Sequence, residues 1–121
     1  MTTEKNASGK ENKSTNLDPS TPFIPASELV IDNLETISLI KHDKKKLLLE
    51  LLLHEEKTIM DMSKETGWNP GTVKRHLSDL VEGGLVTPSK IVVNEFRIKL
   101  KYYRATARQF RFQFIWPPQE K

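Results

Sequence analysis

A glycine–proline break in the middle of the chain constrains the fold more than any other sequence feature. Gly67 suits the position just after a helix, because glycine adopts positive φ without steric cost. Asn69 can cap a following helix, and Pro70 suits the first turn, where no amide donor is needed. The pattern predicts helices over 58–66 and 70–82 joined by a tight turn. Two short helices arranged in this way are typical of a helix-turn-helix.

The apolar periodicity changes from helical to alternating after the second of these helices. Residues 85–103 are rich in β-branched and aromatic side chains on both sides of Asn94-Glu95, which predicts a two-residue turn within a hairpin, or wing. Val86 and Tyr103 are equidistant from that dipeptide, so we expect them to face each other. The expected fold class is α+β, mainly α: a winged helix-turn-helix with a C-terminal β-hairpin wing.

The segments that flank this core differ in composition. Residues 1–22 are polar and are predicted to be a disordered N-terminal tail, because they contain too little apolar surface to offset the entropy of ordering. The expected domain covers 23–121. An apolar stripe with a serine at its start predicts an N-terminal helix over 27–41, and a leucine cluster predicts a core helix over 43–54. Residues 105–118 form a C-terminal extension for packing or dimerisation.

The aromatic residues of that extension allow several interpretations. Phe110, Phe112, Phe114 and Trp116 alternate with other residues, as in a third strand or a segment that follows a short helix. They can form core beneath the first helix, or part of a dimer interface. A pocket for a small apolar effector is a third alternative. A stacking platform for single-stranded nucleic acid is a fourth, because arginines are interspersed among the aromatic rings.

Charge is distributed unevenly along the chain. Residues 1–70 carry nine Lys/Arg and twelve Asp/Glu, a net charge of −3, whereas residues 71–121 carry ten and four, a net charge of +6. A basic half of this kind favours contact with a polyanion such as DNA. The alternative is an uneven spread of ordinary surface charge in a short chain.

Several classes of protein do not fit the sequence. Cysteine is absent, which excludes disulfides, thiolate metal sites and cysteine nucleophiles. No apolar run approaches the length of a membrane span, and the first residues lack the apolar core of a secretory signal, so we expect a cytoplasmic protein without a membrane partner. We expect no enzyme and no cofactor, because the sequence has no glycine-rich phosphate loop, nucleophile elbow or paired carboxylates beside a pocket signal.

One continuous run within the second helix and beyond resembles a known family. The run Thr72-Val-Lys-Arg-His-Leu-Ser-Asp-Leu-Val-Glu-Gly-Gly-Leu-Val is similar to the recognition helix and wing start of ArsR-type winged helix-turn-helix regulators. Lys101-Tyr-Tyr-Arg-Ala-Thr resembles their returning wing strand, especially in archaeal members. Some relatives sense metals through a cysteine pair on the first helix of the motif. The matching Ile59-Met60-Asp61-Met62 has no cysteine, so the resemblance implies an archaeal type without that metal site.

The resemblance implies a homodimer that binds double-stranded DNA in a sequence-specific manner, with the recognition helix in the major groove. Arg75 is the first candidate for a base contact, because its guanidinium can bind guanine O6 and N7 together. The full set of candidate DNA-binding residues is Asn69, Thr72, Lys74, Arg75, His76, Lys90, Arg97, Lys99 and Lys101. For His76 a packing role is the alternative to a phosphate contact.

Alternatives to DNA binding stay open at this point. Arg97, Lys99 and Lys101 alternate along the second wing strand, where they suit the DNA backbone or minor groove, but cations on an edge strand also deter association between strand edges. A winged helix can also serve as a protein-interaction module in a transcription-related assembly. The sequence does not identify the operator, the target genes, a small-molecule effector, or the direction of regulation.

Overall fold

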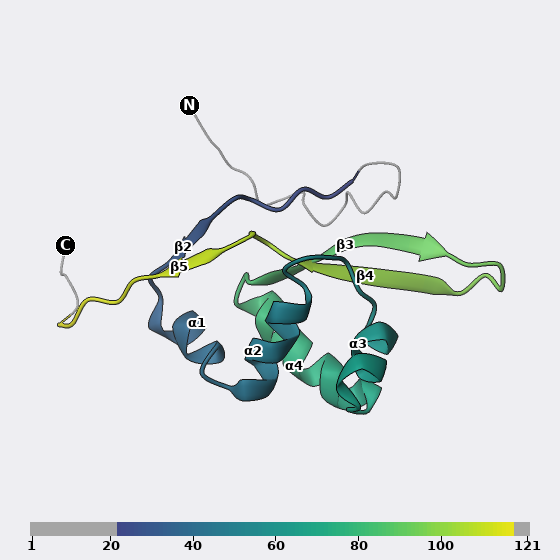
Figure 1. The fold of residues 1–121 in the computed structure, drawn as a ribbon, viewed down its shortest axis with the longest axis horizontal. Coiled ribbons are helices and arrows are strands. Elements are labelled where there is room, and N and C mark those ends of the chain that lie inside the picture. Colours follow the sequence, from purple (N-terminus) through teal and green to yellow (C-terminus); the bar gives the residue numbers. More distant parts are fainter. Residues whose placement is uncertain (1–21, 118–121) are drawn as a thin grey trace.

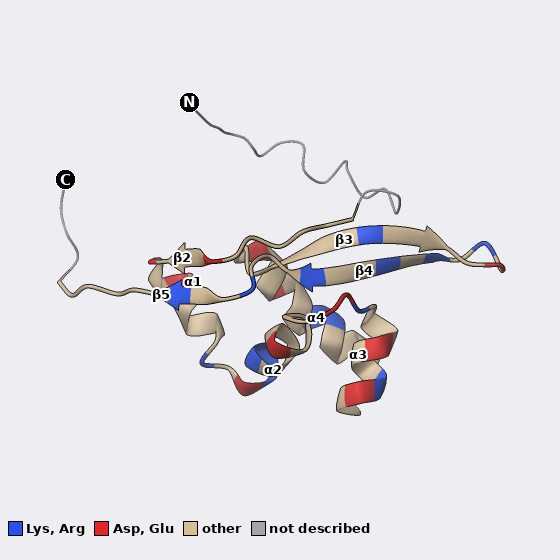
Figure 2. Cartoon of the chain, turned by 45° about the horizontal axis from the view of Figure 1, so that its top comes forward, with Lys and Arg blue, Asp and Glu red and all other residues tan. Residues whose placement is uncertain are grey.

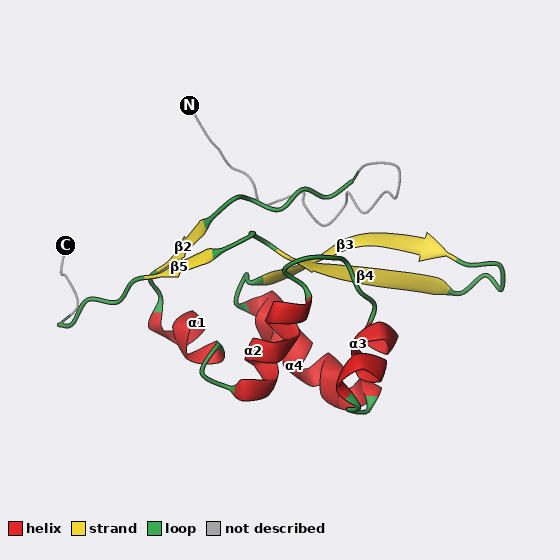
Figure 3. Cartoon of the chain, viewed as in Figure 1, coloured by secondary structure: helices red, strands yellow, loops and turns green. Residues whose placement is uncertain are grey.

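The computed structural model describes residues 22–117. Four helices lie along one side of a long β-hairpin, and a short second sheet lies near the ends of the described chain (Figures 1 and 3). The predicted disordered tail, apart from residue 22, lies outside the described residues, as does residue 118. In chain order the elements are β2 (Leu29–Ile31), α1 (Leu34–Leu39), α2 (Asp43–Leu51), α3 (Ile59–Thr66), α4 (Pro70–Glu82), β3 (Val86–Val93), β4 (Lys99–Ala105) and β5 (Phe110–Phe112).

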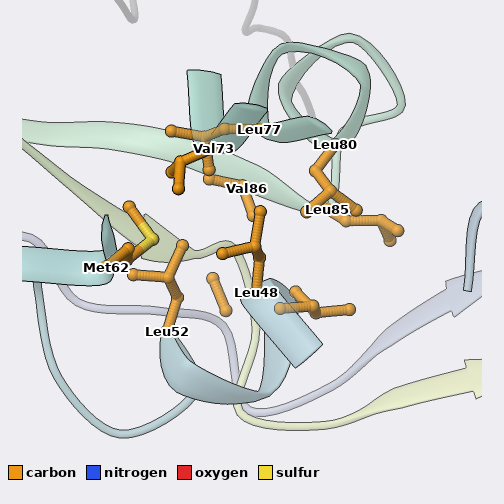
Figure 4. Close-up of a cluster of buried hydrophobic side chains, with 10 residues drawn as sticks. Leu48, Leu52, Met62, Val73, Leu77, Leu80, Leu85 and Val86 are labelled. Carbon is orange, nitrogen blue, oxygen red and sulfur yellow. The ribbon is translucent and has the colours of Figure 1, made fainter. Parts of the chain in front are cut away.

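The hydrophobic core lies where α2, α3 and α4 meet the base of the hairpin (Figure 4). The side chains of Leu48, Met62, Val73 and Leu80 have no exposed surface. Burying a side chain of this size contributes about 1.5–3 kcal/mol, so truncating one would strongly destabilise the domain. The core residues are Leu48, Leu49, Leu52, Met62, Val73, Leu77, Leu80, Leu85, Val86 and Ala105.

The predicted helix-turn-helix is present as α3 and α4. Thr58 caps α3 in a reciprocal capping box with Asp61, in which each side chain accepts from the other residue's backbone amide. Gly67 ends the helix with φ of 82°, a left-handed conformation that favours glycine. Local chemistry therefore fixes both ends of α3.

The single helix predicted over 27–41 is wrong. Residues Leu29–Ile31 form β2, and only Leu34–Leu39 is helical. The side chain of Asn33, not a serine at residue 27, caps this helix by accepting from the Thr36 amide at 2.7 Å. Leu29–Ile31 pair in parallel with Phe110–Phe112. The strand forms because a partner more than 75 residues away along the chain satisfies its backbone, which helical periodicity cannot reveal.

The core helix predicted over 43–54 ends earlier, at Leu51. The carbonyl of Leu52 accepts from the Ala105 amide at 3.1 Å and from Nε of Arg104 at 3.2 Å. The carbonyl of Leu53 accepts from the same guanidinium at 3.3 Å. Residues of strand β4 thus donate hydrogen bonds to the carbonyls that follow the helix end, where a longer helix would have used them.

The wing is a hairpin, but its predicted turn and register are wrong. Asn94 accepts at Oδ1 from the amides of Phe96 and Ile98, and its own amide donates to the Ile98 carbonyl, which closes a longer loop. Val86 faces Ala105 instead of Tyr103, and the register shifts between Pro88 and Lys90. The longer loop and the irregularity together account for the displaced register.

Candidate nucleic-acid interface

The cap at the N-terminus of α4 uses part of the hydrogen-bonding capacity of that helix end. Pro70 has no amide hydrogen, Asn69 Oδ1 accepts from the Thr72 amide at 2.9 Å, and the Asn69 carbonyl accepts from the Val73 amide at 3.2 Å. The Gly71 amide has no hydrogen-bond partner among the described residues. The Asn69 side chain therefore caps the helix, and it occupies the Thr72 amide, which would otherwise be available to an anion.

The exposed face of α4 follows from its helical period. Val73, Leu77 and Leu80 bury one face against the core. At about 100° per residue, Arg75 and Ser78 point in the opposite direction, and both are exposed. The recognition helix therefore presents a guanidinium at the centre of its outer face.

His76 lies in the interior, and its predicted role in DNA contact is corrected to a packing role. Only 7% of its surface is exposed. Nδ1 of His76 accepts from Nζ of the buried Lys45 at 3.1 Å, and the ring packs against His42 with centroids 4.8 Å apart. Burial, then the charge of Lys45, lowers the pKa of His76 below its ordinary value of 6.5.

A groove of about 430 Å³ separates α4 from the wing. The exposed Lys74 lines its helix side and the exposed Lys101 its strand side, and the carboxylates of Asp79 and Glu82 also line it. Ser78 also lines the groove, although the sequence did not single it out. Its position four residues after Lys74 is the signal that could have indicated it, because residues with that spacing share a helix face.

The remaining wing candidates occupy different environments. Lys99 is exposed on β4, and Arg97 is exposed in the loop with φ of 65°. Lys90 makes an ion pair with Glu56 at 3.1 Å, and its Nζ lies 4.9 Å from the ring centroid of Tyr102. The structure thus holds Lys90 in internal contacts.

Acidic and basic residues both lie on the helices of the helix-turn-helix (Figure 2), but they differ in how many of them make ion pairs. Asp61 is used in a cap, Glu65 pairs with the buried Lys57, and Asp79 pairs with Lys45 at 3.3 Å. By contrast, no ion pair within residues 22–117 involves Lys74, Arg75, Arg97, Lys99 or Lys101. The fold neutralises several of the carboxylates and leaves these cations available.

The part of the chain that the structure describes lacks two kinds of feature. No cluster of three or more His, Cys, Asp or Glu side chains there could hold a metal ion. None of the described helices has the length and apolar character needed to cross a membrane.

Comparison with known families identifies the domain that carries this surface. Residues 42–87, from the start of α2 into β3, match the family described as bacterial regulatory protein, arsR family. The match covers α2, α3 and α4, so this segment is similar to the helix-turn-helix domain of that family. The predicted recognition is confirmed for this segment, whereas the archaeal type stays a prediction. No curated protein matches the sequence.

A solved structure supports the fold of this chain. The homodimeric winged helix-turn-helix DNA-binding domain of a possible ArsR-family transcriptional regulator from Mycobacterium bovis is 19% identical with a TM-score of 0.51. That match covers 84% of this chain and 77% of the other. It confirms the predicted fold class, a small α+β winged helix-turn-helix.

Two other solved structures are similar over a shorter region. A possible transcriptional regulator for arsenical resistance is 26% identical, with a TM-score of 0.49 over 60% of this chain and 70% of that one. The transcriptional regulator HlyU from Vibrio vulnificus is 17% identical, with a TM-score of 0.47 over 57% of this chain and 66% of that one.

Proposed function

We propose that this chain is a sequence-specific regulator of transcription that binds double-stranded DNA as a homodimer and works by binding instead of catalysis. Helix α4 enters the major groove, and the wing contacts the backbone or minor groove. The observation that carries the proposal is that Lys74 and Arg75 of α4 and Lys101 of the wing are exposed and make no ion pair within residues 22–117. The arsR family match supports the regulatory role.

Helix α4 has the features that major-groove recognition requires. Its inner face is buried, its outer face carries Arg75, and its N-terminal half lacks acidic side chains. A guanidinium here can donate two parallel hydrogen bonds to a guanine edge. Lys74 and Thr72, together with the free Gly71 amide, suit the neighbouring phosphates.

The wing supplies a second set of cations at a distance from the helix. Lys99 and Lys101 project from β4, and Arg97 extends from the loop. Two separate cationic elements on one chain can contact one duplex across adjacent backbone segments. The Mycobacterium bovis domain of the same fold is homodimeric. Two recognition helices would then read half-sites roughly 34 Å apart.

Duplex DNA provides the test. The full chain is used to select bound sequences from a random duplex library, and the selected duplex is then titrated between about 50 and 200 mM salt, a range over which phosphate contacts weaken DNA binding strongly. We expect an inverted repeat and an affinity that falls steeply with salt. Absence of duplex binding at low salt would overturn the proposal and favour a protein-interaction module. Binding without sequence preference would reject base recognition by α4.

A further inference from the structure

Strand β5 has one paired edge and one open edge. The amide of Leu29 donates to the Gln109 carbonyl at 3.1 Å, and the amide of Gln113 donates to the Ile31 carbonyl at 2.9 Å. In a parallel ladder, alternate residues of one strand direct both backbone groups toward the same neighbour. Gln109, Arg111 and Gln113 therefore face β2.

The intervening residues, Phe110, Phe112 and Phe114, direct their backbone groups to the opposite edge. The backbone groups of these three residues have no hydrogen-bond partner among residues 22–117, because the pairing with β2 uses the backbone of the residues between them. Strand order places β5 in a sheet of two strands, with β2 as its neighbour (Figure 1). An open row of donors and acceptors is a template for another extended strand.

The sequence along this edge is self-complementary. Residues 110–114 read Phe-Arg-Phe-Gln-Phe, a pattern that is symmetric in its aromatic positions about Phe112. If two copies pair antiparallel about Phe112, Phe110 lies opposite the partner's Phe114. All three aromatic positions then become hydrogen-bonded pairs, each of which exchanges two bonds. Arg111 lies opposite the partner's Gln113, so no two like charges face each other.

Exposed apolar side chains continue from the same edge. Phe114 is 50% exposed and Trp116 is 77% exposed. Together with Leu34 and Ile115 they line a depression of about 610 Å³ beside the start of α1. A contiguous apolar surface of this kind on a small domain marks an interaction site.

The composition of residues 1–21 is a poor match for this apolar surface. Residues 1–21 contain Met1 and Leu17 as their only large apolar side chains. A polar segment of that composition cannot match a row of aromatic rings. A second copy offers the same open edge and the same apolar residues, which is what a twofold interface requires.

We propose that two copies of this chain associate by antiparallel pairing of residues 110–114, which joins their short sheets in the order β2–β5–β5–β2. The inference rests on the part of the proposed function in which two copies act together, and it names the surface that joins them. Phe114, Ile115 and Trp116 of each copy become covered when the pair forms. The pairing itself needs no DNA.

Cysteine cross-linking tests the register, because the 121-residue chain has no cysteine of its own. Tagged Arg111→Cys protein is mixed with untagged Gln113→Cys protein and oxidised without DNA. The proposed register brings these two positions to a Cα separation of about 4.5 Å, within disulfide range. We expect tagged–untagged dimers several times more abundant than the cross-linked dimers of either variant alone. Equal yields of disulfide-linked dimer in the mixture and in each variant oxidised alone would overturn the proposal. The absence of any cross-link would also overturn it.

A matched pair of substitutions tests the interface in solution. Phe114→Lys places a charge on the pairing edge, whereas Phe96→Lys makes the same change at another exposed phenylalanine, at the wing tip. Light scattering without DNA should give a mass of two chains for the unmodified protein and Phe96→Lys, and one chain for Phe114→Lys. A dimeric Phe114→Lys, or an unmodified monomer, would contradict the inference.

The outcomes separate this inference from the proposed function. An unmodified monomer that binds DNA would reject the interface alone. Cross-linking in the expected register without any DNA affinity would reject the DNA-binding role and leave the interface in place.

Discussion

Nζ of Lys45 on α2 donates a hydrogen bond of 3.1 Å to Nδ1 of His76 on α4, and both residues are buried. An ammonium has no acceptor, so Nδ1 must be unprotonated and the imidazole neutral. Lys45 also pairs with Asp79 one turn further along α4, at 3.3 Å. One lysine thus holds the recognition helix against α2, and part of this connection depends on the protonation state of His76.

Stability should therefore fall on mild acidification. Burial, then Lys45, lowers the pKa of His76 in the folded state below 6.5, so the unfolded chain binds a proton first as pH falls. More protons on the unfolded state mean a smaller free energy of unfolding. The contribution is complete above pH 6.5 and is lost progressively below it. Urea denaturation at pH 5 to 8 should show this slope, and His76→Gln should reduce it. His54→Gln, at an exposed histidine, is the control and should retain it.

Replacement of Arg75 by alanine should relax sequence preference. The guanidinium lies on the outer face of α4 and makes no ion pair within the described residues, so its loss leaves the core intact. Loss of a bidentate base contact costs about 1–3 kcal/mol at one base position. Competition between the selected duplex and single-base variants measures this. Arg108→Ala, at an exposed arginine outside α4 and the wing, should leave discrimination unchanged. An unaltered preference in Arg75→Ala would remove this residue from base recognition.

Replacement of Lys101 by alanine should have a different signature. A phosphate contact carries no base information, so affinity should fall by a similar factor for every duplex. The slope of log affinity against log salt should decrease in magnitude by about 1. Lys41→Ala removes an equal charge from the exposed connection between α1 and α2 and serves as the control. If both variants change the salt slope equally, the effect belongs to net charge and not to the wing groove.

Gly67 should tolerate asparagine better than alanine. Its φ is 82°, and a Cβ built there would meet no atom within 4 Å, so only backbone strain opposes substitution. Alanine in this conformation costs about 1–2 kcal/mol, whereas asparagine adopts it more readily. Thermal or urea unfolding should rank the native chain first, then Gly67→Asn, then Gly67→Ala. Equal stability of the two variants would show that the turn is not under steric control.

The helix-turn-helix could be predicted because its signals are local. The cap at Asn69, the proline at the first position of α4 and the left-handed Gly67 act within a few residues of the turn. The same locality explains why Arg75 could be placed on the outer face. The prediction failed where the local pattern was ambiguous: Leu29 and Val30 fit a helical stripe, but in the structure Leu29–Ile31 is a strand in which Val30 is exposed.

The candidate interface was only partly predictable. The sequence indicated cations on α4 and on the second wing strand, and the structure leaves Lys74, Arg75 and Lys101 exposed. It did not indicate that Lys90 makes an ion pair with Glu56, since that contact joins the wing to the connection between α2 and α3. Lysines that are equivalent in the sequence pattern therefore have different roles in the structure, because Lys90 lies beside a glutamate that is distant in the sequence.

The sequence by itself determined the glycine–proline turn and the two helices around it, because caps, φ preferences and apolar spacing act between adjacent residues. Only the tertiary structure decided that Leu29–Ile31 pairs with Phe110–Phe112 and that His76 lies against Lys45. It also decided that Lys74 and Lys101 share a groove. These features depend on contacts between segments far apart in the chain, and such contacts form only when the core brings those segments together.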